Sequence, residues 1–271
     1  MKPDDYLLGH DDDELQRLED QARILGPATR TILGRAGIER GMRVLDLGTG
    51  VGDVAFEVAH LVGESGAVVG VDRSPEALAR ARGRASERGT ANVEFIEGDL
   101  ATVDLDGPFD AVVGRLVLLY APEPALTIKR FATLVRSGGV VVAMEYEMTT
   151  AGSLPRDEFT DRVVSWINGA FACAGLDPLL GARLGDVMTA AGLRSPSILG
   201  FQSYLAPGDP AGGRMMADVV KTLLPVIVSS NLASQDEIDI DTLAERVTAL
   251  HASSGSLLKP PALVGCWATV E

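Results

Sequence analysis

The chain has 271 residues, of which 46% are hydrophobic, and it carries a formal net charge of −14 at pH 7. A chain of this length can bury a sizeable apolar core, either as one large domain or as a domain with a cap. The negative charge repels polyanions, so it argues against DNA, RNA and anionic membrane surfaces as partners and favours a small neutral or cationic molecule.

Targeting and metal-binding signals are also lacking in the sequence. No run of about 18 apolar residues predicts a membrane-spanning helix, and the acidic N-terminus has no apolar signal region. Cys173 and Cys266 are each flanked by apolar residues, and the three histidines have no ligand-like spacing. We therefore expect buried thiols, no metal site and a cytoplasmic protein.

The first 40 residues predict a helical lid. Apolar residues recur at helical spacing over 11–26, a segment that opens with four consecutive acidic residues, as suits a helix N-terminus. A second helix is expected from about Pro27 to Ala36, because proline favours the first helical turn and Gly37 suits the end.

Strands and helices alternate over residues 41–147, the predicted core. The expected strands are 43–47, 67–71, 93–96, 109–113 and 140–146, and the expected helices are 51–62, 75–88 and 123–135. This alternation is typical of a doubly wound parallel sheet.

After Tyr146 the alternation stops. Residues 148–193 predict a helical cap insert, and residues 194–271 predict the last two strands of the core with a second helical insert at about 206–259. We therefore expect an α/β fold with a doubly wound, Rossmann-like, seven-stranded sheet, N-terminal helices and helical cap inserts. Such folds bind ligands in the crevice at the carboxyl ends of their strands.

A glycine-rich loop follows the first predicted strand, in the run Asp46-Leu47-Gly48-Thr49-Gly50-Val51-Gly52-Asp53. A dinucleotide-binding loop would require glycine at position 53, where this chain has an aspartate. A carboxylate at a helix N-terminus competes with phosphate for that site. The loop is therefore expected to bind a ligand without phosphates.

An acidic residue also ends the second predicted strand, a little over 20 residues beyond the loop. Asp72, followed by Arg73, could accept hydrogen bonds from both ribose hydroxyls and would repel a 2′-phosphate. The alternative is a solvated or capping carboxylate.

The pattern Asp-x-Gly-x-Gly-x-Gly, with acids at the next two strand ends, resembles the class I S-adenosylmethionine (SAM)-dependent methyltransferases over residues 41–147. The segments 6–18, 114–124 and 260–268 are similar to bacterial, often actinobacterial, small-molecule and natural-product methyltransferases of the ubiquinone-biosynthesis-like type. The resemblance implies SAM as cofactor, S-adenosylhomocysteine as product, and cofactor contacts from Asp46, Gly48, Thr49, Gly50, Asp72, Arg73, Asp99, Leu100 and Arg115.

Within that resemblance, Asp99 at the end of the third strand would accept from the adenine amino group, and the adjacent amide of Leu100 would meet the ring. A plain turn aspartate is the alternative. Asp46 would order the loop or contact the ammonium group. Arg115 would bind the SAM carboxylate, a substrate acid or an acid of the N-terminal segment, unless it pairs with a local carboxylate.

Methyl transfer from a sulfonium is an in-line displacement that depends mainly on positioning in a dry pocket, and a base is needed only if the acceptor loses a proton. The catalytic candidates are Tyr6 and His10, in a segment that folds over the SAM site in related enzymes, and Glu145 and Tyr146 at a strand end. Glu145 is the better base candidate, because burial raises a carboxyl pKa.

The expected reaction is methylation of carbon, nitrogen or oxygen in an aromatic, indole or polyketide-like small molecule of specialised metabolism. The alternatives are an RNA or protein methyltransferase, a SAM-binding protein without catalysis, and a nicotinamide oxidoreductase. The apolar helix expected at 215–228 could serve a homodimer interface or a cap.

Overall fold

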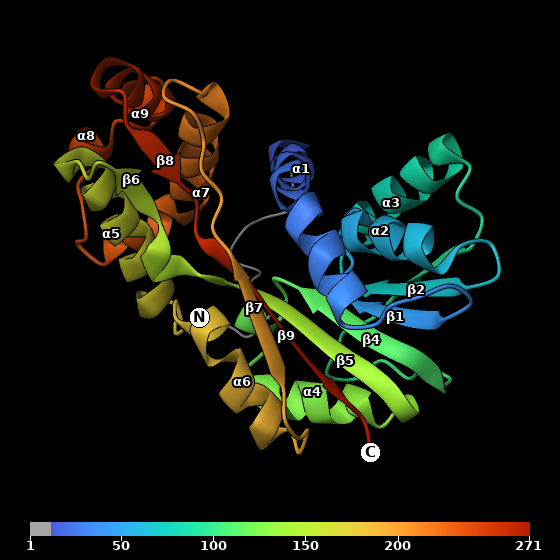
Figure 1. Cartoon of the computed structure of the whole chain (residues 1–271). Coiled ribbons are helices and arrows are strands. Elements are labelled where there is room, and N and C mark those ends of the chain that lie inside the picture. The colour runs from blue at the N-terminus through green and yellow to red at the C-terminus, as the bar shows by residue number, and fades with distance from the viewer. Residues whose placement is uncertain (1–11) are drawn as a thin grey trace. The chain divides into compact units, whose positions relative to one another are not determined.

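The structure is a computed structural model that describes the backbone from residue 12 to residue 271 and the side chains from residue 24 onward (Figure 1). The chain divides into two compact units. Of the described residues, the sheet unit consists of 18–145, 181–200 and 263–271, and the helical unit of 12–17, 146–180 and 201–262. The four-part division expected above remains a prediction.

The sheet unit is built on seven strands in the order β3-β2-β1-β4-β5-β9-β7. The strands are β1 (Arg43–Leu47), β2 (Ala67–Asp72), β3 (Val93–Glu97), β4 (Phe109–Arg115), β5 (Val135–Glu147), β7 (Ser197–Phe201) and β9 (Ala262–Thr269). The first five pair in parallel, and the chain reverses direction across the sheet between β1 and β4. The expected doubly wound, seven-stranded fold is confirmed, and the crevice beyond the ends of β1 and β4 is the point at which such folds bind ligands.

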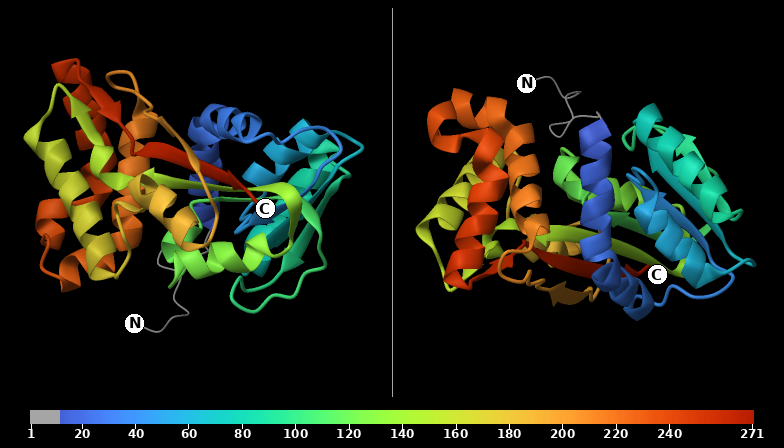
Figure 2. Two further views of the ribbon diagram at one scale, coloured as in Figure 1. Left: turned by 60° about the horizontal axis from the view of Figure 1, so that its bottom comes forward. Right: turned by 90° about the horizontal axis from the view of Figure 1, so that it is seen from above.

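Helices cover both faces of this sheet. Figures 1 and 2 show α2 (Asp53–Val62) and α3 (Pro75–Arg88) on one face and α4 (Pro124–Ala132) and α6 (Leu180–Ala190) on the other. The strands between these layers are accordingly apolar on both sides, as in β1, where Val44 and Leu45 are fully buried.

The N-terminal segment forms one helix rather than the two expected. The helix α1 (Asp12–Arg35) continues through Pro27. A proline inside a helix removes one hydrogen-bond donor and crowds the carbonyl four residues earlier, but buried residues on both sides of it, Leu25 and Ile32, hold the helix together. Ile32 packs so closely on β9 that a methyl group added at Gly265 would lie 2.6 Å from its Cγ2 atom.

The predicted helix 123–135 is too long at its C-terminal end, and the strand after it starts earlier than expected. Helix α4 ends at Ala132, and β5 begins at Val135. Two glycines in the first half of β5 pair with the end of β9: Gly138 N donates to Val270 O and Val270 N donates to Gly139 O, both at 2.8 Å. The start of β5 thus lies beside the end of β9, so the two strands run in opposite directions.

The helical unit contains α5 (Glu158–Cys173), α7 (Pro210–Ser229), α8 (Gln235–Ile238) and α9 (Ile240–Ser254). A small antiparallel sheet of β6 (Gly152–Leu154) and β8 (Leu257–Lys259) was not predicted, because three-residue strands are too short to show a period. The expectation of two buried thiols was wrong for Cys173, which is exposed, whereas Cys266 is buried. Apolar sequence neighbours do not determine which face of a helix a residue occupies.

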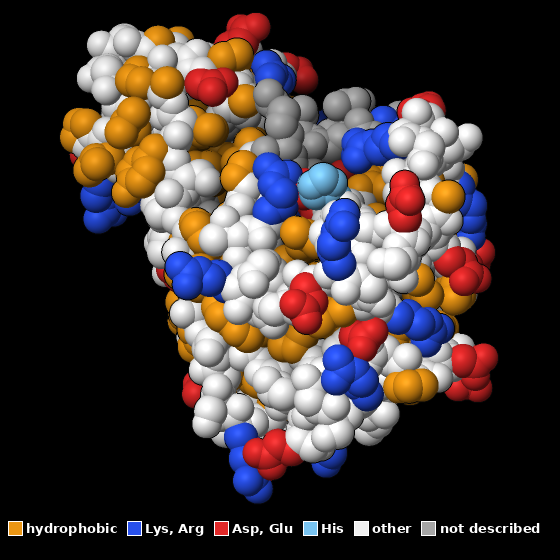
Figure 3. Space-filling view, turned by 45° about the vertical axis from the view of Figure 1, so that its right-hand side comes forward, with side chains coloured by type: hydrophobic (Ala, Val, Ile, Leu, Met, Phe, Trp, Pro, Cys, Tyr) orange, Lys and Arg blue, Asp and Glu red, His pale blue; other side chains and the backbone are white. Residues whose placement is uncertain are grey.

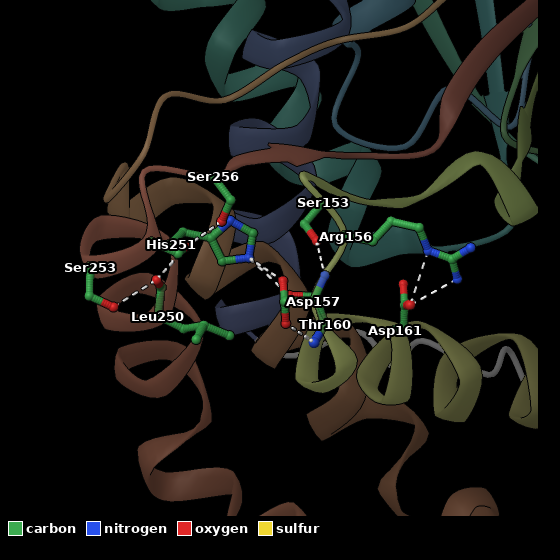
Figure 4. A network of polar contacts seen from close by, with 10 residues as sticks. Ser153, Arg156, Asp157, Thr160, Asp161, Leu250, His251, Ser253 and Ser256 are labelled. Carbon is green, nitrogen blue, oxygen red and sulfur yellow. Dashed lines mark hydrogen bonds and ion pairs between the residues drawn. The ribbon is translucent and has the colours of Figure 1, made fainter.

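A buried polar network joins α5 to α9 in this unit (Figure 4). Asp157 caps α5 by accepting from Thr160 N at 2.7 Å, and its own amide donates to Ser153 Oγ at 3.0 Å. The Thr160 hydroxyl lies 2.9 Å from Nε2 of His251, whose side chain is buried in α9. Because the network links β6, the N-terminus of α5 and α9, it holds the turn between β6 and α5 against α9.

The packing of α7 on α9 leads to a first prediction. A methyl group added at Gly213 would lie 2.3 Å from both Ala244 O and Thr248 Oγ1 of α9, and a helix backbone cannot yield there. We expect Gly213→Ala to lower the free energy of unfolding by about 1–3 kcal/mol. The matched control is Gly83→Ala in α3, where nothing lies within 4 Å of the added methyl; it should be stabilising by up to about 1 kcal/mol. Denaturant unfolding of both variants measures the difference, and a stabilised Gly213→Ala would contradict the packing described here.

Candidate functional site

The glycine loop after β1 has a backbone that only glycine adopts without strain. Gly48, Gly50 and Gly52 have φ angles of 63°, 54° and 89°. A methyl group at Gly50 would meet nothing within 4 Å, whereas one at Gly48 would lie 2.4 Å from Val117 Cγ2. Gly48 therefore admits Val117, and Gly50 leaves its backbone accessible to a ligand.

A buried hydrogen bond between the side chains of Asp46 and Thr49 stabilises this loop. Thr49 Oγ1 donates to Asp46 Oδ2 at 2.7 Å, and both side chains are buried. Burial raises the pKa of Asp46 to about 7, although the bond from Thr49 and the charge of Arg115 oppose that rise. The structure thus shows Asp46 ordering the loop, one of the two roles expected for it.

Asp72 joins the end of β2 to the loop. Its Oδ2 atom accepts from Gly50 N at 2.8 Å, and its Oδ1 atom accepts from Ser74 N at 2.9 Å. A carboxylate has about four lone-pair sites, so each oxygen retains capacity for a further donor. Asp72 is half-buried and could accept hydroxyl groups, whereas Arg73 beside it is exposed.

Asp99 and Leu100 lie at the end of β3, the next strand in the sheet. Gly98 N donates to Asp72 O at 2.9 Å, which places this end beside the end of β2. Asp99 is exposed, and its Oδ1 atom accepts from Ala101 N at 2.7 Å, as in a plain turn aspartate. The side chain remains accessible for an amino group, while the Leu100 carbonyl accepts from Arg130.

Arg115 ends β4 and reaches α1. Its Nη1 atom donates to Thr29 Oγ1 at 3.0 Å, and its charge lowers the pKa of Asp46. The sheet order therefore brings Asp46, Asp72, Asp99 and Arg115, each within two residues of the carboxyl end of a strand, to one edge of the sheet unit.

Glu145 lies at the same edge of the sheet, but its side chain is buried inside the protein. Its side chain is 1% exposed, and its Oε1 atom accepts from Val117 N at 2.9 Å and Leu118 N at 2.7 Å. Burial raises the pKa of Glu145 to about 8 in spite of these backbone bonds. Val117 and Leu118 were not singled out in the sequence, because only the register of β4 on β5 shows that they face Glu145.

The other catalytic candidates are placed differently. Tyr146 follows Glu145 on β5 and is half-buried, and since successive side chains of a strand alternate, the two point to opposite faces of the sheet. Tyr6 and His10 lie outside the residues that the structure describes. A catalytic role for each of these four residues remains a prediction.

Asp53 opens α2, where a phosphate-binding loop would have glycine. Arg84 of α3 donates to Asp53 Oδ1 at 2.7 Å and to Val51 O at 2.6 Å. The helix N-terminus is thus occupied by an ion pair of the chain itself, in line with a ligand that carries no phosphate.

Within residues 12–271 no helix is long and apolar enough to cross a membrane. Among the side chains that the structure describes, those of residues 24–271, there is no group of three or more His, Cys, Asp or Glu that could hold a metal ion.

Residues 38–171 match a family of methyltransferase domains. The chain is 40% identical over 107 residues to an arsenite methyltransferase of Aquipseudomonas alcaligenes, covering 36% of this chain and 31% of that protein. It is 34% identical over 116 residues to the aklanonic acid methyltransferase DauC of Streptomyces sp. strain C5, covering 42% and 52% of the two chains. A SAM-dependent methyltransferase from Aquifex aeolicus has a similar fold, with a TM-score of 0.55 at 19% identity, over 70% of this chain and 93% of that one. The chain thus spans between about a third and a half of the length of these two curated relatives.

The raised pKa values lead to a prediction about stability and pH. A carboxyl group that binds its proton more tightly in the folded state stabilises the fold fully below its unfolded pKa, and that contribution is lost as pH rises through the folded value. Between pH 5 and 9 the wild-type protein should therefore lose stability as Asp46 and then Glu145 ionise, with folded pKa values of about 7 and about 8.

Glu145→Gln cannot ionise, so the free energy of unfolding of this variant should fall less steeply over that range. The difference should approach about 1.4 kcal/mol per pH unit at most below the folded pKa of Glu145. Denaturant titrations at pH 5, 7 and 9 measure it, with Glu64→Gln at an exposed position as the control. Equal slopes for the two variants would show that Glu145 is not buried as a neutral acid.

Proposed function

We propose that this chain, whose core is that of a class I SAM-dependent methyltransferase with SAM as its cofactor, methylates a small-molecule acceptor. The observation that carries the proposal is the row of polar groups at the carboxyl ends of β1, β2, β3 and β4, beside an open glycine loop. SAM supplies an activated methyl group, so the residues of the chain need mainly to bind, orient and exclude water.

We assign the cofactor contacts to the residues expected from the sequence. Asp72 would accept the ribose hydroxyls, because both of its oxygens are fixed by backbone amides and keep free lone pairs. Asp99 and Leu100 would meet the adenine. The backbone of Gly48, Thr49 and Gly50 would lie along the methionine part of SAM. Asp46 and Arg115 would lie next to that part, and Arg73 would flank the ribose. Each hydrogen-bonding part of SAM then meets a strand end that presents a suitable donor or acceptor.

We propose that residues outside the core determine which acceptor binds. The names of the two curated relatives reported above give an inorganic acceptor in one case and an organic acid in the other. We propose an aromatic, indole or polyketide-like acceptor of specialised metabolism, methylated at carbon, nitrogen or oxygen. The DauC relative, named for an organic acid acceptor, and the apolar helices of the helical unit favour an organic molecule.

The charge of the chain favours a small acceptor over RNA. The formal net charge is −14, and Figure 3 shows Lys and Arg side chains interspersed with acidic and apolar ones over the visible face. A polyanion binds best to a continuous basic surface. RNA or protein methylation and SAM binding without catalysis remain the alternatives.

Release of S-adenosylhomocysteine tests the proposed function. Purified protein with SAM should release it only when a suitable phenol, indole, quinol or polyketide acid is added. Release with transcribed RNA or a mixed protein fraction in place of these compounds would favour the alternative acceptors. SAM binding without product from any acceptor would favour a non-catalytic protein.

The ribose assignment predicts the effect of Asp72→Ala on SAM binding. Loss of the acceptor oxygens should raise the Kd for SAM about tenfold or more, since hydrogen bonds to a charged group are worth about 1.5–3 kcal/mol. Asp104→Ala, at an exposed acid after β3, is the matched control and should bind SAM as the wild type does. Calorimetric titration gives both constants, and unchanged affinity in Asp72→Ala would refute the assignment.

A further inference from the structure

We propose that Glu145 is a positioning residue, which holds the segment Leu116–Leu118 against the glycine loop and thereby keeps the loop in the form that binds SAM. The proposal rests on the proposed function only in its choice of ligand. It assigns Glu145 a role other than the general base considered above.

The segment after β4 is held by an acceptor from the neighbouring strand. Leu116 N continues the ladder by donating to Met144 O at 2.8 Å, and the chain then turns through a φ angle of 57° at Leu116. A positive φ angle is costly for leucine and persists only where the surroundings enforce it. The surroundings here are the next two amides, of Val117 and Leu118, both bound to Glu145 Oε1.

Glu145 thus does for this turn what an N-cap residue does for a helix. The turn continues as the short 3-10 helix η1 (Leu118–Tyr120), in which Tyr120 N donates to Val117 O at 3.2 Å. The first amides of such a helix have no partner within it. No side-chain cap comes from Val117, the residue at the cap position, so Glu145 supplies the acceptor across strands.

Val117 carries this constraint to the glycine loop. Its side chain packs between two glycines. A methyl group added at Gly48 would lie 2.4 Å from Val117 Cγ2, and one added at Gly114 would lie 2.9 Å from Val117 Cγ1. A shift of Val117 would therefore leave Gly48 without the side chain that packs against it. The path from Glu145 to the loop consists of one hydrogen bond and one packing contact.

The environment of Glu145 fits positioning better than proton transfer. A general base must reach the group whose proton it takes, within about 3.2 Å. Glu145 is 1% exposed, and one of its oxygens already accepts two backbone hydrogens. Burial also keeps it protonated at neutral pH, since its pKa is raised to about 8. A neutral carboxyl group still accepts through its carbonyl oxygen, so the turn does not require the charge.

Replacement by glutamine and by alanine separates the two roles. Glu145→Gln retains an acceptor oxygen but cannot take a proton, and it should leave the Kd for SAM within about threefold of the wild-type value, since the hydrogen bonds survive. Glu145→Ala leaves the amides of Val117 and Leu118 without this acceptor, and the Kd should rise about tenfold or more. Val117→Ala should also raise the Kd, because it removes the side chain that supports Gly48 while Glu145 stays in place.

Ile128→Ala, in the buried face of α4, controls for loss of stability alone, because Ile128 is in the same unit but is not part of this path. It should lower the Tm and leave the SAM affinity unchanged when titrated below that temperature. Once an acceptor substrate is known, Glu145→Gln should also retain the wild-type kcat. If Glu145 were the general base, kcat would fall in this variant.

Equal weakening of SAM binding in Glu145→Gln and Glu145→Ala would overturn the proposal, as would wild-type affinity in Glu145→Ala or in Val117→Ala. Calorimetry with SAM needs no acceptor, so these outcomes are independent of the acceptor assignment. A wild-type protein that binds no SAM would instead contradict the proposed function itself.

Discussion

The contact between Gly48 and Val117 is the constraint on which the candidate site depends. It joins the loop after β1 to the turn after β4, the two segments on either side of the point where the sheet reverses its order. Neither segment is a regular element with its own hydrogen-bond ladder, so each relies on the other and on side chains beneath them. Any residue with a Cβ atom at position 48 would push the two segments apart.

Two buried carboxyl groups stabilise these segments by accepting hydrogen bonds from them. Asp46 receives the Thr49 hydroxyl, and Glu145 receives two backbone amides. Burial would be costly for both as anions, and their raised pKa values show that the fold favours the neutral forms. The acids that are accessible at the same edge, Asp72 and Asp99, lie at the ends of β2 and β3 instead. The edge therefore has buried acids that shape it and accessible acids that can meet a ligand.

The residues proposed to bind the cofactor all lie in one of the two units. The strand ends and the glycine loop belong to the sheet unit, which contains every cofactor residue assigned here. The helical unit is organised around its own polar network of Asp157, Thr160 and His251 and around the close packing of α7 on α9. The two curated relatives reported above are named for different acceptors, one inorganic and one an organic acid.

The sequence by itself determined the fold class and the positions of the strand-end acids, and its resemblance to class I SAM-dependent methyltransferases implied the cofactor. Those features depend on local patterns: a glycine loop needs positive φ angles at fixed positions, and strands buried on both faces are continuously apolar. Predictions from the sequence failed where the structure depends on contacts between residues far apart in the chain. Pro27 was predicted to start a helix, although α1 continues through it between buried neighbours. The strand after α4 was predicted to start at residue 140, although β5 begins at Val135 and its first half pairs with the end of β9. Only the tertiary structure decided that Glu145 faces Val117 and Leu118, because the register of two strands, and not the spacing of residues along the chain, brings those groups together.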